Sequence, residues 1–199
     1  SGGNNNTLIG DNAGTTITTA SNNTAVGSRA MIANTSGAEN TAVGEQALTV
    51  NTTGANNTAI GKAALLLNTT ASYNTVVGSS AMYNNTTGSN NVAVGFQSLQ
   101  QNTTAYQNTA VGTTALKSTT TGLDNTGVGF SAMFANTTGY NNTAVGKSSL
   151  AANTTGAQNT SVGKGALQAN TTASYNTATG HAALTANTTG ASNTAVGWY

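Results

Sequence analysis

Residues 40–56 read NTAVGEQALTVNTTGAN, and this pattern recurs along the whole chain. The glycine equivalent to Gly44 stands at every seventeenth position from Gly10 to Gly197, with no insertion or deletion. A fixed period of this size predicts a solenoid, in which each repeat forms one coil stacked on the last. We number positions within a coil from this glycine as 0. The chain is expected to form one rod of about eleven coils, roughly 50 Å long at ~4.8 Å per coil.

The residues before the glycine predict a short strand. Position −4 is always Asn, −3 is Thr except at Val92, and −1 is Val or Ile except at Thr179. β-Branched side chains favour strands, and alternation places positions −3 and −1 on the same face. We therefore expect parallel strands paired from coil to coil, with the Asn side chains stacked into an amide ladder.

The residues after the glycine follow a different rule. Position +4 is Leu or Met from Met31 to Leu184, never Val or Ile, and position +3 is Ala or Ser. Leu, Met and Ala are good helix formers, and neighbours about 100° apart on a helical turn can share an inward stripe. We favour one helical turn over +1 to +6, ended by Asn at +7 and followed by a Thr-Thr-Gly return turn. A second short strand is the alternative.

Composition excludes several function classes. Charged residues are 5% of the chain, against roughly 25% in ordinary domains, and the net charge is +1. Electrostatic binding of nucleic acid is therefore not expected. No apolar run approaches the ~18 residues that suggest a membrane span. Cysteine is absent, and the one histidine, His181, cannot form a triad or a metal site with four scattered acids: Asp11, Glu39, Glu45 and Asp124. We expect no enzyme, no catalytic or metal-binding residues and no cofactor.

The array divides into two parts. Residues 1–22 are expected to form an irregular first coil or partial cap, because Gly14 replaces Leu at +4 and Ile17 replaces Asn at +7. Residues 23–199 form the regular array. Because the chain begins at Ser1 and stops two residues into a repeat at Tyr199, we expect it to be a piece of a longer protein.

Self-association is expected from the small core of each coil. One Val, one Leu or Met and two small residues per coil bury little apolar surface against the entropy of ordering seventeen residues. A thin coil with a Thr/Val outer face is therefore expected to pack against copies of itself, as a parallel homotrimer.

The aromatic residues are candidates for a ligand or protomer interface, because they occupy variable positions that must face outward. We favour burial between protomers, with glycan binding as the alternative. The candidates are Tyr73, Tyr83, Phe96, Tyr106, Phe130, Phe134, Tyr140, Tyr175 and Trp198.

Two threonine patterns carry alternative interpretations. The Thr column at −3 resembles the flat arrays with which solenoid ice-binding proteins order water. The alternative, which we favour, is that these threonines form a core or interface face. Asn34-Thr35-Ser36 and its equivalents are formal N-glycosylation acceptors, which we interpret as turns.

The pattern Asn-Thr-Ala-Val-Gly, two free residues, Ala-Leu, two free residues and Asn-Thr-Thr-Gly resembles repeats of phage and bacterial tail-fibre-like proteins. The resemblance covers residues 23–199, and a looser one extends to the head repeats of trimeric autotransporter adhesins. It implies a trimeric fibre or adhesin stalk, located outside the cell, on its surface or on a virion. The chain is therefore expected to be a structural or adhesive spacer. A binding module for glycan or ice is the alternative.

Overall fold

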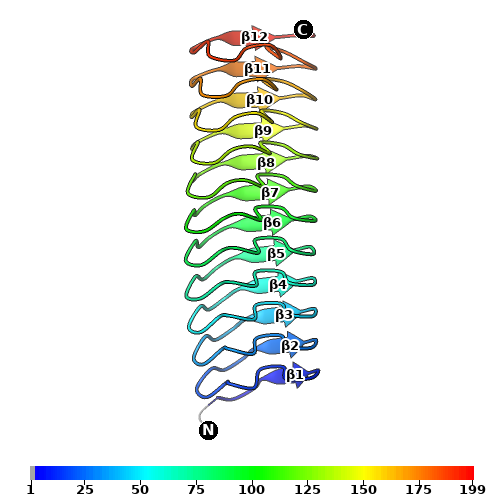
Figure 1. The fold of residues 1–199 in the computed structure, drawn as a ribbon, viewed down its shortest axis with the longest axis vertical. Coiled ribbons are helices and arrows are strands. Elements are labelled where there is room, and N and C mark those ends of the chain that lie inside the picture. The colour runs from blue at the N-terminus through cyan, green and yellow to red at the C-terminus, as the bar shows by residue number, and fades with distance from the viewer. Residues whose placement is uncertain (1–2) are drawn as a thin grey trace.

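The computed structural model describes residues 3–199, which form a rod-shaped β-solenoid (Figure 1). Each coil contributes one strand of three residues, and the strands form a single parallel sheet in chain order. The strands are β1 (Thr7–Ile9), β2 (Thr24–Val26), β3 (Thr41–Val43), β4 (Thr58–Ile60), β5 (Thr75–Val77), β6 (Val92–Val94), β7 (Thr109–Val111), β8 (Thr126–Val128), β9 (Thr143–Val145), β10 (Thr160–Val162), β11 (Thr177–Thr179) and β12 (Thr194–Val196).

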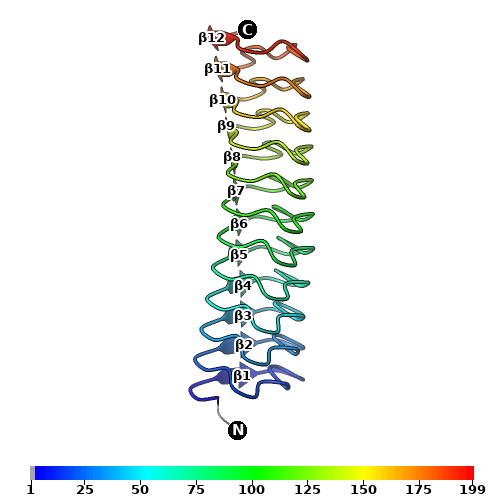
Figure 2. The same ribbon diagram turned by 90° about the vertical axis from the view of Figure 1, so that its left-hand side faces the viewer.

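The coils superimpose by a constant shift of seventeen residues. Thr41 pairs with Thr58, Ala42 with Ala59 and Val43 with Ile60, and the same register holds for every neighbouring pair of strands. The strands lie along one edge of the rod and the turns along the other (Figure 2). The predicted β-solenoid, its period and the position of its strands are confirmed.

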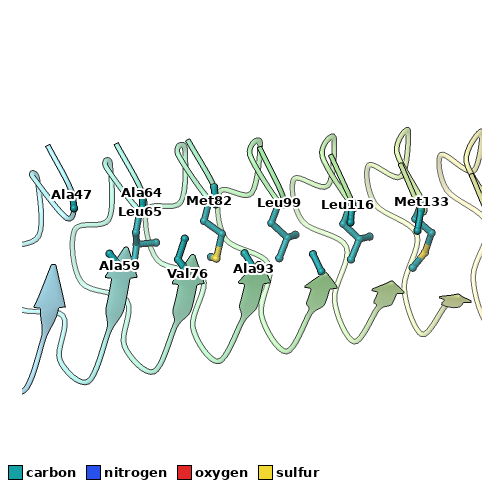
Figure 3. Close-up of a cluster of buried hydrophobic side chains, with 14 of the residues drawn as sticks. Ala47, Ala59, Ala64, Leu65, Val76, Met82, Ala93, Leu99, Leu116 and Met133 are labelled. Atoms are coloured by element: carbon teal, nitrogen blue, oxygen red, sulfur yellow. The ribbon is translucent and has the colours of Figure 1, made fainter. Parts of the chain in front are cut away.

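The core is one side chain thick. The middle residue of each strand from β2 to β11 is buried against the Ala or Ser at +3 and the Leu or Met at +4 (Figure 3). Leu65, Met82, Leu99, Leu116 and Met133 are fully buried. Strand alternation turns the small middle residue inward, so Thr and Val share the outer face, as expected, and the count of one Val per coil among the buried residues is wrong.

The predicted helical turn is also wrong, and no second strand takes its place. Residues +1 to +6 form consecutive turns. In the coil that begins at Gly95, Gln97 and Leu99 have φ of +55° and +48°, far from the helical value of about −63°. The Gln97 N–H donates to Ser79 O in the preceding coil and the Leu99 N–H to Ala115 O in the next. The backbone thus bonds to both neighbouring coils.

This conformation explains the choice of side chain at +4. Every residue there from Met31 to Leu184 has φ between +44° and +53°. A left-handed residue with a β-branched side chain is a steric outlier, whereas an unbranched Cβ is tolerated at lower cost. Val and Ile are excluded by the sign of φ and not by helix propensity.

Two columns of buried asparagine link the coils, and the one at −4 confirms the predicted amide ladder. Asn40 Oδ1 accepts both the backbone N–H and the Nδ2 of Asn57, at 3.0 and 3.1 Å. The second column is at +7, where Asn51 Nδ2 donates to Asn34 Oδ1 at 2.9 Å. Both columns meet at position +10, since the carbonyl of Gly54 accepts from Asn40 and Asn51, each at 2.9 Å. These bonds hold the return turn against the strand.

The glycine at position 0 is required for two reasons. Gly112 has φ of +133°, a region that side chains disfavour. A Cβ added to it would lie 2.5 Å from the carbonyl oxygen of Gly129 in the next coil. Close approach of successive coils therefore requires glycine at this corner in each of them.

The first coil keeps the register of the array. β1 pairs residue for residue with β2, although Gly14 occupies the Leu position. A Cβ on Gly14 would lie 2.6 Å from Leu8 Cδ2. Leu8, which replaces the small middle residue of the strand, thus occupies the space left by Gly14.

Candidate binding surfaces

One face of the rod is flat, periodic and uncharged. It consists of the first and third residues of β2 to β11, which we call the Thr/Val face. Its side chains are half-buried or exposed; Val111 and Val145, for example, are 36% and 37% exposed. All charged residues lie at +1, +2, +5 or +12, outside this face. The face therefore offers columns of methyl and hydroxyl groups spaced by ~4.8 Å.

The hydroxyl groups on this face have no partner within the described residues. No strand Thr between residues 3 and 199 makes a side-chain hydrogen bond. The Thr column at +8 behaves oppositely: Thr52 Oγ1 donates to Thr69 O at 3.0 Å, and Thr69 Oγ1 to Thr86 O at the same distance. The +8 hydroxyls hold coils together, whereas those of the Thr/Val face remain available to water or a partner.

The structure does not gather the nine candidate aromatics into one site. Tyr73 and Tyr175, both at +12, are about equally exposed, at 62% and 61%, but lie six coils apart. Tyr83 is half-buried, and the other six are exposed. Among the described residues, close aromatic ring pairs form only around His181, with Trp198 at 4.8 Å and Tyr199 at 6.5 Å between centroids.

Two of these aromatics interact with lysines in neighbouring coils. The Lys117 Nζ lies 5.8 Å from the ring centroid of Phe134, and the Lys147 Nζ lies 5.7 Å from that of Phe130. Cation–π contacts at exposed sites are worth about 0.5–1 kcal/mol. These rings therefore already have a role within the rod.

Residues 3–199 contain no group of three His, Cys, Asp or Glu side chains that could hold a metal ion. Nor does any helix of these residues reach the length and apolar character needed to cross a bilayer.

A run of basic side chains is a feature that the sequence interpretation missed. Lys147, Lys164 and His181 occupy position +1 of three successive coils. They border a hollow of about 230 Å³, next to Gly165 and Ala182. The signal was present in the sequence, because alignment on the 17-residue period places the three residues in one column.

A larger hollow, of about 670 Å³, lies on the wall formed by positions +5 and +6. Small residues create it, since Ala135, Ala151, Ala152 and Ala169 stand where several earlier coils have larger side chains, such as Leu66, Leu67 and Lys117. Phe134 borders it and is 39% exposed. The hollow is apolar and open, with no charged group around it.

Comparison with family models, with curated protein sequences and with solved structures finds no match to this chain.

Proposed function

We propose that the chain is a rod-shaped spacer segment of an extracellular fibre or adhesin, and that it assembles through the Thr/Val face into a parallel homotrimer. The observation that carries this proposal is strict periodicity: every coil adds the same strand in the same register. The length of such a rod is set only by the number of repeats, which suits a spacer.

The periodicity also supports self-association. The Thr/Val face repeats every ~4.8 Å along the rod, and a second copy of the chain has the same repeat. Rods aligned in parallel can therefore match side chain to side chain along their whole length. The face carries half-exposed Val and no charge, as suits the centre of a protein interface. Threefold symmetry follows from the resemblance to trimeric fibres.

The test compares two double variants by light scattering after size exclusion. V111K/V145K places charges on the Thr/Val face without entering the core. T121K/T155K places the same charges at position +9, which is also exposed. The wild type and T121K/T155K are expected to have three times the chain mass, and V111K/V145K the mass of a monomer with an unchanged circular dichroism spectrum. A folded wild-type monomer at micromolar concentration would overturn the trimer.

The unpartnered strand hydroxyls support a second candidate, the binding of ice. A flat array of Thr hydroxyl and Val methyl groups at fixed spacing can order water into a lattice. Thermal hysteresis of the wild type, lost in V111K/V145K and kept in T121K/T155K, is the expected result for this function. A trimer without thermal hysteresis would exclude it.

A further inference from the structure

We propose that Lys147, Lys164 and His181 form a binding site for an oxyanion of the sulfate or phosphate class. The first observation is their stacking. Equivalent positions in neighbouring coils lie ~4.8 Å apart at the backbone, so Lys147 and Lys164 place like charges in adjacent coils, with the Lys147 Nζ 5.7 Å from the Phe130 ring centroid. Like charges directly opposite one another on neighbouring strands are destabilising. A bound anion would remove this repulsion.

The second observation is the lack of a compensating acid. Within residues 3–199 the only ion pair joins Lys62 Nζ to Glu45 Oε2, at 2.9 Å. Lys62 occupies the same position +1, so this column can hold an acid beside a lysine. No Asp or Glu follows Asp124 in the sequence. Lys147 and Lys164 therefore form no ion pair with an acid in the part of the chain that the structure describes.

The third observation is the hollow itself. Lys147, Lys164 and His181 line about 230 Å³ of space, together with Ser148 and Gln168. Position +2 is Gly165 in one coil and Ala182 in the next, and no other described coil has glycine there. These small residues leave space beside the lysines, whereas some other coils fill position +2 with longer side chains such as Arg29 and Gln97. The side-chain amide of Gln168 and the hydroxyl of Ser148 can donate hydrogen bonds across the space.

The fourth observation is an unmet hydrogen bond. His181 Nδ1 is enclosed and has no partner among the described residues. The ring packs against Trp198 with 4.8 Å between centroids and 40° between the ring planes. The side chains of two lysines, a histidine and two neutral donor residues thus line one space, which suits an oxyanion with several acceptor oxygens.

The test is a titration of the folded chain with sodium sulfate, and separately with sodium phosphate, monitored by amide chemical shifts at constant ionic strength set with sodium chloride. We expect saturable shifts centred on Gly165 and Ala182. K147Q/K164Q is expected to weaken binding by about tenfold or more. K62Q is the matched control, since it removes a lysine from the same position of another coil, and it is expected to leave the affinity unchanged.

A sulfated oligosaccharide distinguishes a free anion from one carried on a glycan. Tighter binding of the oligosaccharide than of sulfate identifies a glycan as the source, and equal or weaker binding identifies the free anion. Shifts spread over all lysines, or equal weakening in K62Q and K147Q/K164Q, would overturn the proposal. So would a lack of saturation by both inorganic anions.

Thermal unfolding checks that the variants fold. Because the substitutions remove like charges from adjacent coils, K147Q/K164Q is expected to unfold at the same or a higher temperature than the wild type at low salt. Sulfate should raise the unfolding temperature of the wild type and not that of K147Q/K164Q. The trimer proposal can fail without affecting these results, because none of the three residues lies on the Thr/Val face.

Discussion

The side-chain oxygen of Asn102 is buried beside Thr119 of the next coil and has no hydrogen-bond partner among the described residues. At the equivalent contact in other coils an Asn Nδ2 donates, as Asn102 itself does to Asn85 Oδ1 at 2.7 Å. Thr119 has no side-chain amide to donate to Asn102. Its hydroxyl oxygen accepts a long hydrogen bond, of 3.4 Å, from Asn136 Nδ2. The ladder at +7 is interrupted at this contact.

Thr119→Asn should repair the ladder. The new amide can donate to Asn102 and accept from Asn136, and one restored buried hydrogen bond is worth about 1 kcal/mol. The melting temperature, followed by circular dichroism, is expected to rise by about 2–4 °C. Thr119→Val is the control, because it keeps the shape without the hydroxyl and should lower the melting temperature. No increase for Thr119→Asn would mean that Asn102 is satisfied in another way.

Position +4 provides a direct test of the left-handed backbone. Leu99 has φ of +48° and is fully buried. Leu99→Ile keeps the volume but places a branched Cβ in a left-handed conformation, and should cost about 2 kcal/mol or more in urea unfolding. Leu99→Met should cost less than about 1.5 kcal/mol, because Met31, Met82 and Met133 occupy this column. Equal costs would contradict the assigned backbone.

Two glycines with positive φ should differ sharply in tolerance. Gly112→Ala meets the Gly129 carbonyl and is expected to destabilise the rod by more than about 3 kcal/mol. Gly165→Ala has only the flexible end of Gln168 within 4 Å, at 3.2 Å, and φ of +68°. Ala63 and Ala182 already adopt that conformation at +2, so its cost should be about 1 kcal/mol or less. Chemical denaturation measures both, and a mild effect at Gly112 would show that the coils can separate locally.

Asn141 and Asn142 are neighbours with opposite environments. Asn142 is 1% exposed, and its Nδ2 donates to Asn125 Oδ1 at 3.2 Å and Gly156 O at 2.9 Å. Asn142→Asp replaces this donor with an acceptor and buries a charge, and should cost more than about 3 kcal/mol at neutral pH. Burial favours the neutral form of the introduced carboxyl and raises its pKa in the folded state. The cost should therefore be smallest below about pH 4 and grow as the pH rises.

Asn141→Asp is the matched control, because Asn141 is exposed and makes no side-chain hydrogen bond within residues 3–199. Its unfolding free energy is expected to change by less than about 0.5 kcal/mol. A similar loss for the two variants would mean that the −4 ladder does not contribute to stability.

Much of the fold was predictable because equivalent residues of successive coils lie in register. The period predicted the solenoid, the β-branched columns located β1 to β12, and the invariant Asn predicted the −4 ladder. The candidate anion site was harder to predict from the sequence. Each of Lys147, Lys164 and His181 is an ordinary surface residue along the sequence, and only stacking brings them around one hollow.

The helical turn at +1 to +6 was a wrong prediction for an identifiable reason. Both a helix and a left-handed residue disfavour a β-branched side chain, so Leu or Met at +4 cannot distinguish them. The repeat alone was sufficient to predict the number, length and register of the coils, because these follow from identical side chains meeting at a constant interval. The signs of φ at +2 and +4 were decided by the tertiary structure. They depend on backbone groups of adjacent coils that must bond to each other, which no single repeat contains.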